Sequence, residues 1–195
     1  MAYTHKELSD RAMRWLHGTM RCHPVFAGLA SCAEVPDAIG WTSRYQFRGS
    51  IVVECKTSHS DFLADKKKAI QWRHPDPLRG AFCHPGRRIA RSMAKREGYI
   101  EESVPRMGDF RYFMCTGAPI ICRKDIEKHA PDHGLLYWEG RRIRVVVEAP
   151  RRQIVDYPAE IRYLRFAIIN SKTPHGSEFK SLQQLKEGFG ASTGT

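Results

Sequence analysis

Three residues in two short segments carry side chains that could bind a metal ion and move a proton. Glu54 and Lys56 lie in the apolar run 51–57, and Asp37 follows Pro36 with sixteen residues between it and Glu54. Alternate residues of a strand face opposite sides, so Glu54 and Lys56 point the same way. Burying a charged side chain costs free energy unless an opposite charge or a metal ion binds it. Carboxylates bind hard cations such as Mg²⁺, and a nearby amine can hold or deprotonate water.

These residues belong to a longer pattern. Segments 34–41, 54–58 with Asp61 and Phe62, and 107–113 together resemble the PD-(D/E)xK superfamily of restriction-endonuclease-like nucleases, in a branch of small phage and bacterial proteins. The resemblance runs roughly from the first helix to Val147. It implies an α/β fold with a restriction-endonuclease-like core, in which helices flank a central mixed β-sheet.

The resemblance also implies an activity, a Mg²⁺- or Mn²⁺-dependent deoxyribonuclease. Such metals lower the pKa of bound water and neutralise charge on the phosphate. Asp37 and Glu54 are the expected metal ligands, together with the backbone carbonyl of Cys55. Lys56 is expected to hold or deprotonate the attacking water, or to stabilise transition-state charge. Glu34 and Glu7 are secondary metal-ligand candidates.

Each of these residues also has a simpler interpretation. Asp37 follows a proline and is compatible with an ordinary turn. Glu54 and Lys56 are compatible with an ion pair that holds no metal. Glu34 suits a surface position. Glu7 is explained by a capping box, because Thr4 precedes it by three residues, as an N-cap residue should.

The chain is strongly basic, with a formal net charge of +11 and a pI of about 9.6. This balance favours a polyanionic partner, with nucleic acid first. Arg111 is expected either to touch phosphate or to pair with Asp109, and the remaining basic stretch is alternatively a solvated charged face. The predicted DNA-contacting residues are Lys66, Lys67, Lys68, Arg73, Arg79, Arg87, Arg88, Arg91, Lys95, Arg96 and Arg111.

Composition restricts where the protein acts. No apolar run approaches the roughly 20 residues that cross a bilayer, and no export signal is visible at the N-terminus. The six scattered cysteines suit reduced thiols, and without short-spaced pairs they do not predict structural zinc. We therefore expect a cytoplasmic protein of a bacterial host cell, with no membrane as a partner. Resembling nucleases often dimerise, which adds a homodimer to the expectations.

Hydrophobic periodicity predicts the elements that must position these residues. A nuclease-like domain is expected over 1–150, with a basic insertion at about 74–106, a C-terminal helical extension over 151–187 and a disordered tail over 188–195. A helix opening at 58–61 is expected to carry Ile70 on its apolar stripe. The other predicted elements are a first helix after Thr4, strands at 25–30, 37–41, 51–57 and 111–115, a short helix or covering loop at 120–129, a hairpin of 135–138 with 143–147, and helices at 87–97, 159–170 and 177–187.

Two functional hypotheses remain open. The first is a metal-dependent nuclease that hydrolyses phosphodiester bonds of duplex or branched DNA. The second is a non-catalytic factor on the same fold that binds nucleic acid or a protein, in phage counter-defence or regulation. An RNA- or nucleotide-directed hydrolase is a third. A panel of nucleic acids with Mg²⁺, Mn²⁺ or EDTA separates them.

Overall fold

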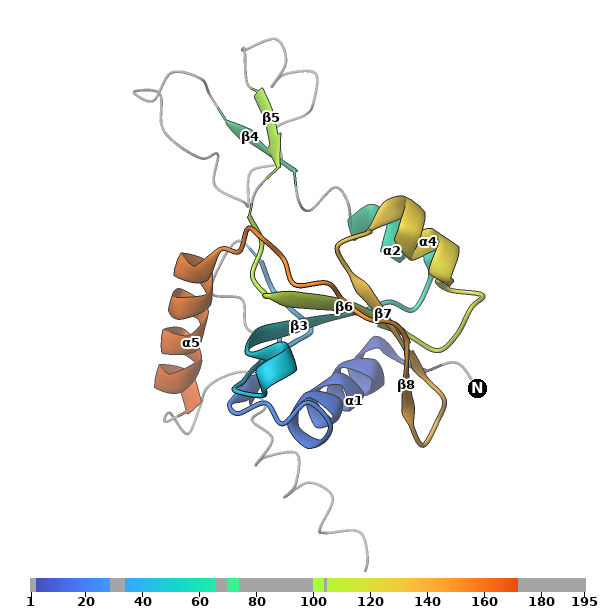
Figure 1. Ribbon diagram of the computed structural model, residues 1–195, viewed down its shortest axis with the longest axis horizontal. Coiled ribbons are helices and arrows are strands. Elements are labelled where there is room, and N and C mark those ends of the chain that lie inside the picture. The colour runs from blue at the N-terminus through green and yellow to red at the C-terminus, as the bar shows by residue number, and fades with distance from the viewer. Residues whose placement is uncertain (1–2, 29–33, 66–69, 74–99, 104, 172–195) are drawn as a thin grey trace, which may run out of the picture.

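The computed structural model describes residues 3–28, 34–65, 70–73, 100–103 and 105–171. Its centre is a mixed six-stranded sheet in the order β1-β2-β3-β6-β7-β8, flanked by helices, which confirms the expected α/β class (Figure 1). The strands of this sheet are β1 (Val25–Phe26), β2 (Ala38–Thr42), β3 (Gly49–Cys55), β6 (Phe110–Cys115), β7 (Gly134–Trp138) and β8 (Ile143–Val147).

Helix α1 (His5–Gly18) covers one face of the sheet (Figure 1). It begins as predicted with a capping box, in which Thr4 and Glu7 satisfy each other's backbone N–H groups. Its apolar stripe, which includes Leu8 and Leu16, packs against Val53 and the rest of one strand face. This packing fixes which residues of β3 point away from α1.

The opposite face carries two separate apolar clusters. Helix α5 (Tyr157–Ser171) packs over Val52 and the β2 side of the sheet. Helices α2 (His59–Asp65) and α4 (Arg123–His129) pack over Phe113 and the β6–β7 side. Glu54 lies on this face, between Val52 and Lys56 in sequence, so a polar region separates the two clusters.

Two strand pairings bring the candidate residues together. β2 and β3 are antiparallel, with Ala38 opposite Val53, and continuing that register by one residue sets Asp37 opposite Glu54. β3 and β6 are parallel, with Val52 opposite Arg111. Arg111 therefore shares the face of Glu54 and lies diagonal to it.

Three sequence predictions change in the structure. Ile70 begins strand β4 (Ile70–Arg73), which pairs with β5 (Ile100–Ser103), so its placement on the preceding helix was wrong. The partner strand lies far along the chain, and local periodicity does not register it. The strand expected at 25–30 is limited in the described residues to β1. The helix expected at 159–170 extends over Tyr157–Ser171 as α5 and packs directly on the sheet.

Several predicted segments lie outside the described residues. They include the helix at 87–97, most of the basic insertion, the helix at 177–187 and the tail at 188–195. The hairpin of 135–138 with 143–147 is confirmed as β7 and β8. Among the described helices, none is long and apolar enough to cross a membrane.

Candidate active site

Asp37 stands at the start of β2 and reaches across to β3. Its Oδ2 accepts a hydrogen bond from the Cys55 backbone N–H at 2.6 Å, and His5 Nε2 approaches the same oxygen at 3.2 Å. Both contacts use Oδ2, so Oδ1 remains for another ligand. The side chain is 18% exposed. Asp37 is thus tied to the strand that carries Glu54 and still meets solvent.

Glu54 projects from β3 into the polar region and is almost fully buried. Its Oε1 lies 3.1 Å from a terminal guanidinium nitrogen of Arg111 and 3.8 Å from one of Arg106. Both ion pairs use Oε1, which leaves Oε2. Burial raises the pKa of Glu54 to about 7, and the charges of Asp37 and Asp65 add to that rise against the opposing arginines. The Asp37 effect places the two carboxylates close enough to interact.

Lys56 follows the same strand and is 2% exposed. Its Nζ lies 3.0 Å from Asp65 Oδ1, and the other oxygen of Asp65 accepts from Arg106 at 2.9 Å. The expected ion pair between Glu54 and Lys56 is therefore replaced by two pairs with different partners. Lys56 has three ammonium protons and Asp65 engages one of them, so donors remain.

Glu34 is not the surface residue that one interpretation expected. Its carboxylate accepts from Arg106 Nε at 2.7 Å and from the Met107 backbone N–H at 3.0 Å, and it lies 2.6 Å from Arg111. Although burial opposes ionisation of Glu34, the charges of Arg111 and Arg106 hold its pKa below the ordinary value. Glu34 thus balances the arginines that would otherwise neutralise Glu54.

Glu7 fits its capping-box interpretation, whereas Arg111 differs from both of its predicted roles. Glu7 spends its carboxylate on the helix cap, accepting from the Thr4 backbone and hydroxyl. Arg111 is fully buried and contacts Glu34 and Glu54, so both the expected phosphate contact and the expected pair with Asp109 need correction. A guanidinium sealed between carboxylates meets no solvent and hence no nucleic acid.

Other predicted residues are less constrained by the structure. The Cys55 side chain is buried toward α1, and its proposed carbonyl ligation stays a prediction. Among the basic candidates, Arg73 ends β4. The rest, Lys66, Lys67, Lys68, Arg79, Arg87, Arg88, Arg91, Lys95 and Arg96, lie outside the described residues.

The charges of the described cluster do not cancel. When Glu54 is ionised, four carboxylates face three cationic side chains in a largely buried region, so one negative charge is left over in a low-dielectric surrounding. His5 offsets it only when protonated, although its hydrogen bond to Asp37 raises the pKa of His5. The carboxylates are Glu34, Asp37, Glu54 and Asp65, and the cations are Lys56, Arg106 and Arg111.

The donor set fits a hard divalent cation. Mg²⁺ usually takes one or two protein carboxylates and completes its shell with water or phosphate oxygens. Asp37 and Glu54 supply two carboxylates, each with one oxygen not used by its ion pairs. In the described ranges, no group of three or more His, Cys, Asp or Glu residues forms a ready metal cage.

Two members of the cluster escaped sequence reasoning. Asp65 lies three residues after Phe62 in α2, and both are buried. A carboxylate at a position where the helix pattern calls for an apolar residue predicts a charged side chain that faces the protein interior. Arg106 offered none, because it precedes its strand and its partners are 41 and 72 residues away in sequence.

The comparisons with known proteins add no functional name. The sequence matches no protein-family model, and it matches none of the curated proteins. Among solved structures, the chain is similar to the SPO1766 protein of unknown function from Silicibacter pomeroyi. The two share 15% identity over 100% of each chain, with a TM-score of 0.49.

Proposed function

We propose that this protein is a divalent-metal-dependent nuclease of the PD-(D/E)xK type that hydrolyses phosphodiester bonds of DNA. The element order supports this proposal. A helix, α1, precedes the antiparallel β2–β3 pair that carries the acids, α2 follows, and β6 then joins β3 in parallel. This is the order that the sequence resemblance implies for a restriction-endonuclease-like core.

One observation carries the proposal. Asp37 and Glu54 stand on neighbouring strands, each with one oxygen used in contacts with the protein and one left over. Burial is the main cause of the raised pKa of Glu54, and the negative charge of Asp37 adds to it, so a cation near both carboxylates would be favourable. A divalent cation between them would supply this positive charge.

The side chains then have distinct roles. Asp37 and Glu54 would hold the Mg²⁺ or Mn²⁺, which lowers the pKa of a bound water and offsets phosphate charge. Lys56 would donate to the attacking water or to a phosphate oxygen, and Asp65 would fix the direction of its ammonium group. Arg106 would connect Asp65 to Glu34 and keep the polar region rigid.

The test combines metal binding with cleavage. Purified protein is titrated with Mn²⁺, and single-stranded, duplex and branched DNA and RNA are incubated with Mg²⁺, Mn²⁺ or EDTA. Asp37→Asn and Glu54→Gln are each expected to weaken Mn²⁺ binding about 10-fold or more and to lower cleavage about 100-fold or more. Lys56→Ala should lower cleavage about 100-fold while Mn²⁺ still binds.

Glu127→Gln is the matched control. Glu127 is an exposed carboxylate of α4, so its neutralisation removes one charge far from the polar region. It should leave both measurements unchanged. Full cleavage in a folded Asp37→Asn or Glu54→Gln protein would exclude the mechanism, and cleavage of RNA alone would replace DNA as the substrate.

A second candidate function is a non-catalytic binding factor on the same fold. The observation that favours it is the commitment of Glu54 to arginines and of Lys56 to Asp65, all deeply buried. Such buried ion pairs can persist in a former catalytic site that no longer performs a reaction. Tight nucleic-acid binding with no Mn²⁺ binding and no cleavage under any metal would select this function.

A further inference from the structure

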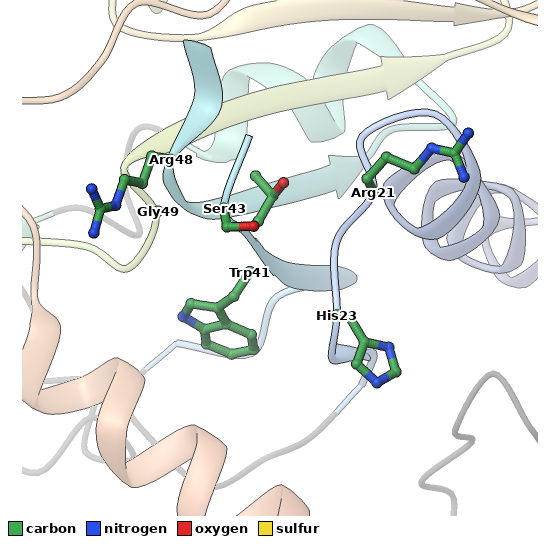
Figure 2. A pocket seen from close by; sticks show the side chains of 7 residues that line it. Arg21, His23, Trp41, Ser43, Arg48 and Gly49 are labelled. Atoms are coloured by element: carbon green, nitrogen blue, oxygen red, sulfur yellow. The ribbon is translucent and has the colours of Figure 1, made fainter. Parts of the chain in front are cut away.

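A hollow of about 420 Å³ opens at the end of β2 opposite to Asp37. Arg21 and Arg48 stand on opposite sides of it, Ser43 and Trp41 lie between them, and His23 lies on the side of Arg21 (Figure 2). The volume is typical of small-ligand sites, about 300–1,000 Å³. Neither proposed function uses this feature.

The chain holds the lining residues in place through its backbone. Helix α1 ends just before Arg21, whose φ of 58° suits the turn that closes the helix, and the Cys22 N–H donates to the Leu16 carbonyl at 2.8 Å. The His23 N–H donates to the Trp41 carbonyl at 2.7 Å. These hydrogen bonds attach the segment that carries Arg21 and His23 to helix α1 and strand β2. The backbone around the hollow is therefore fixed by the fold.

The orientation of the Trp41 ring is also set. Its Nε1–H donates to Glu160 of α5 at 3.4 Å, and Phe26 packs edge-on with ring centroids 6.3 Å apart. The indole N–H is thus satisfied inside the protein while the ring stays partly exposed. Although Trp41 packs partly against the core under α5, the part of its flat ring that remains exposed can act as a stacking surface for another ring.

The positive charge around the hollow favours an anionic ligand. Arg21 and Arg48 are exposed and have no ion pair among the described residues, and no carboxylate is among the described side chains that line the hollow. Cations and purely apolar ligands therefore fit poorly. One guanidinium group can donate two parallel hydrogen bonds to the oxygens of a phosphate. A serine hydroxyl such as that of Ser43 can donate to a phosphate as well.

We propose that this hollow binds one nucleotide unit of single-stranded nucleic acid, with the base stacked on Trp41 and the two phosphates that flank it held by Arg21 on one side and Arg48 on the other. A duplex base has no free face for an indole, so the ligand must present an unpaired base. Trp41 lies four residues from Asp37 along β2, about 13 Å at roughly 3.3 Å per residue. One strand could therefore occupy the hollow and approach Asp37, but binding requires no hydrolysis.

The experiment measures binding in EDTA, so a failure of the proposed nuclease chemistry does not affect it. Fluorescence anisotropy follows a labelled 12-nucleotide single strand and its duplex over a series of salt concentrations. Arg21→Ala with Arg48→Ala should weaken single-strand binding about 10-fold or more and make the plot of log affinity against log salt shallower by about 1.4. Trp41→Ala should weaken binding about 5- to 150-fold without changing that slope, because stacking releases no counterion.

Two controls keep the result interpretable. Arg141→Ala with Arg142→Ala removes the same two charges from the exposed β7–β8 turn and should leave affinity nearly unchanged. Trp41→Phe keeps an aromatic ring and should retain most of the affinity, so loss of binding in a folded Trp41→Ala protein reports stacking. Circular dichroism and the melting temperature verify folding.

Defined outcomes would overturn the proposal. Equal loss in the Arg141 and Arg142 control would indicate a diffuse charge effect. Unchanged binding in the folded Arg21/Arg48 and Trp41 variants would exclude the hollow. Duplex affinity equal to that of the single strand would exclude an unpaired base, and competition by polyglutamate that is insensitive to Trp41→Ala would indicate an acidic peptide. Competition by a 5′-mononucleotide at millimolar concentration, with inorganic phosphate ineffective, supports the proposal and identifies the base as part of the ligand.

Discussion

Glu54 is the residue at which burial, ion pairing and metal affinity compete. Burial favours the protonated carboxyl, the two arginines favour the carboxylate, and Asp37 and Asp65 disfavour it. The pKa of about 7 marks the balance in the metal-free protein. Glu54 thus gives up its proton only in the neutral range, which makes its metal affinity depend on pH.

The protonation of Glu54 links stability and metal affinity to pH. The pKa of Glu54 in the folded protein lies above its ordinary value of 4.5. The native state therefore holds the proton more tightly than the unfolded chain, and this contribution to stability is full below about 4.5 and is lost as the pH rises through about 7. Mn²⁺ competes with that proton, so its affinity should increase between pH 6 and pH 8.

Calorimetric Mn²⁺ titrations and melting curves at pH 5, 6, 7 and 8 measure both effects. Glu54→Gln should flatten the pH dependence of Mn²⁺ affinity. It should also gain stability relative to the natural protein as the pH rises, since the amide never acquires the buried charge. A Mn²⁺ affinity that is constant from pH 6 to pH 8 would contradict the assignment of Glu54 as a ligand.

At the scale of the elements, the buried carboxylate of Glu160 adds polar contacts to the apolar packing of α5 on the sheet. Glu160 accepts from the Ser50 hydroxyl at 2.7 Å, the Gly108 N–H at 2.6 Å and the Trp41 indole at 3.4 Å. These donors belong to β2, β3 and the turn before β6. Glu160 thereby couples the helix to the strands that carry the candidate site and the hollow.

Removing this carboxylate should destabilise the protein measurably. Glu160→Ala leaves the Gly108 N–H and the Trp41 indole N–H without their acceptor, whereas the Ser50 hydroxyl can still donate to Asp109 Oδ2 at 3.1 Å, and we expect a loss of about 2–4 kcal/mol in the free energy of unfolding. Urea denaturation measures it. Arg162→Ala, on the exposed side of the same helix, should change stability by less than about 0.5 kcal/mol. Equal effects of the two substitutions would mean that Glu160 does not anchor the helix.

At the scale of the whole molecule, the net charge of +11 should govern encounter with nucleic acid. The described site contributes little to this attraction, because its arginines are buried among carboxylates. The exposed Arg21 and Arg48 can supply attraction, and the basic sequence of 66–96 stays a predicted contributor. Such contacts bind phosphates without reading sequence.

Salt dependence tests the basic stretch. Arg87→Ala with Arg88→Ala should make the slope of log affinity against log salt shallower by about 1.4 on single strands and about 1.8 on duplex DNA. The effect should appear with both forms, in contrast to Trp41→Ala. An affinity that does not vary with salt would exclude this stretch as a phosphate-binding surface.

Local pattern was sufficient for much of the fold and for the identity of the central residues. Alternation in 51–57 placed Glu54 and Lys56 on one face of a strand, and the capping box placed the start of α1. Both features depend on residues a few positions apart, and such spacing survives folding unchanged. The same local view was wrong at Ile70, whose strand partner lies some thirty residues further on.

The amino-acid sequence alone therefore determined the α/β class, the strand that carries Glu54 and Lys56, and the positive charge that favours a polyanion. Only the tertiary structure decided that Glu54 pairs with Arg111, that Lys56 pairs with Asp65, and that Arg21 and Trp41 share one hollow. The physical reason is range. Side-chain direction follows from neighbouring residues, whereas burial and charge pairing arise between residues that meet only when strands distant in sequence assemble into one sheet.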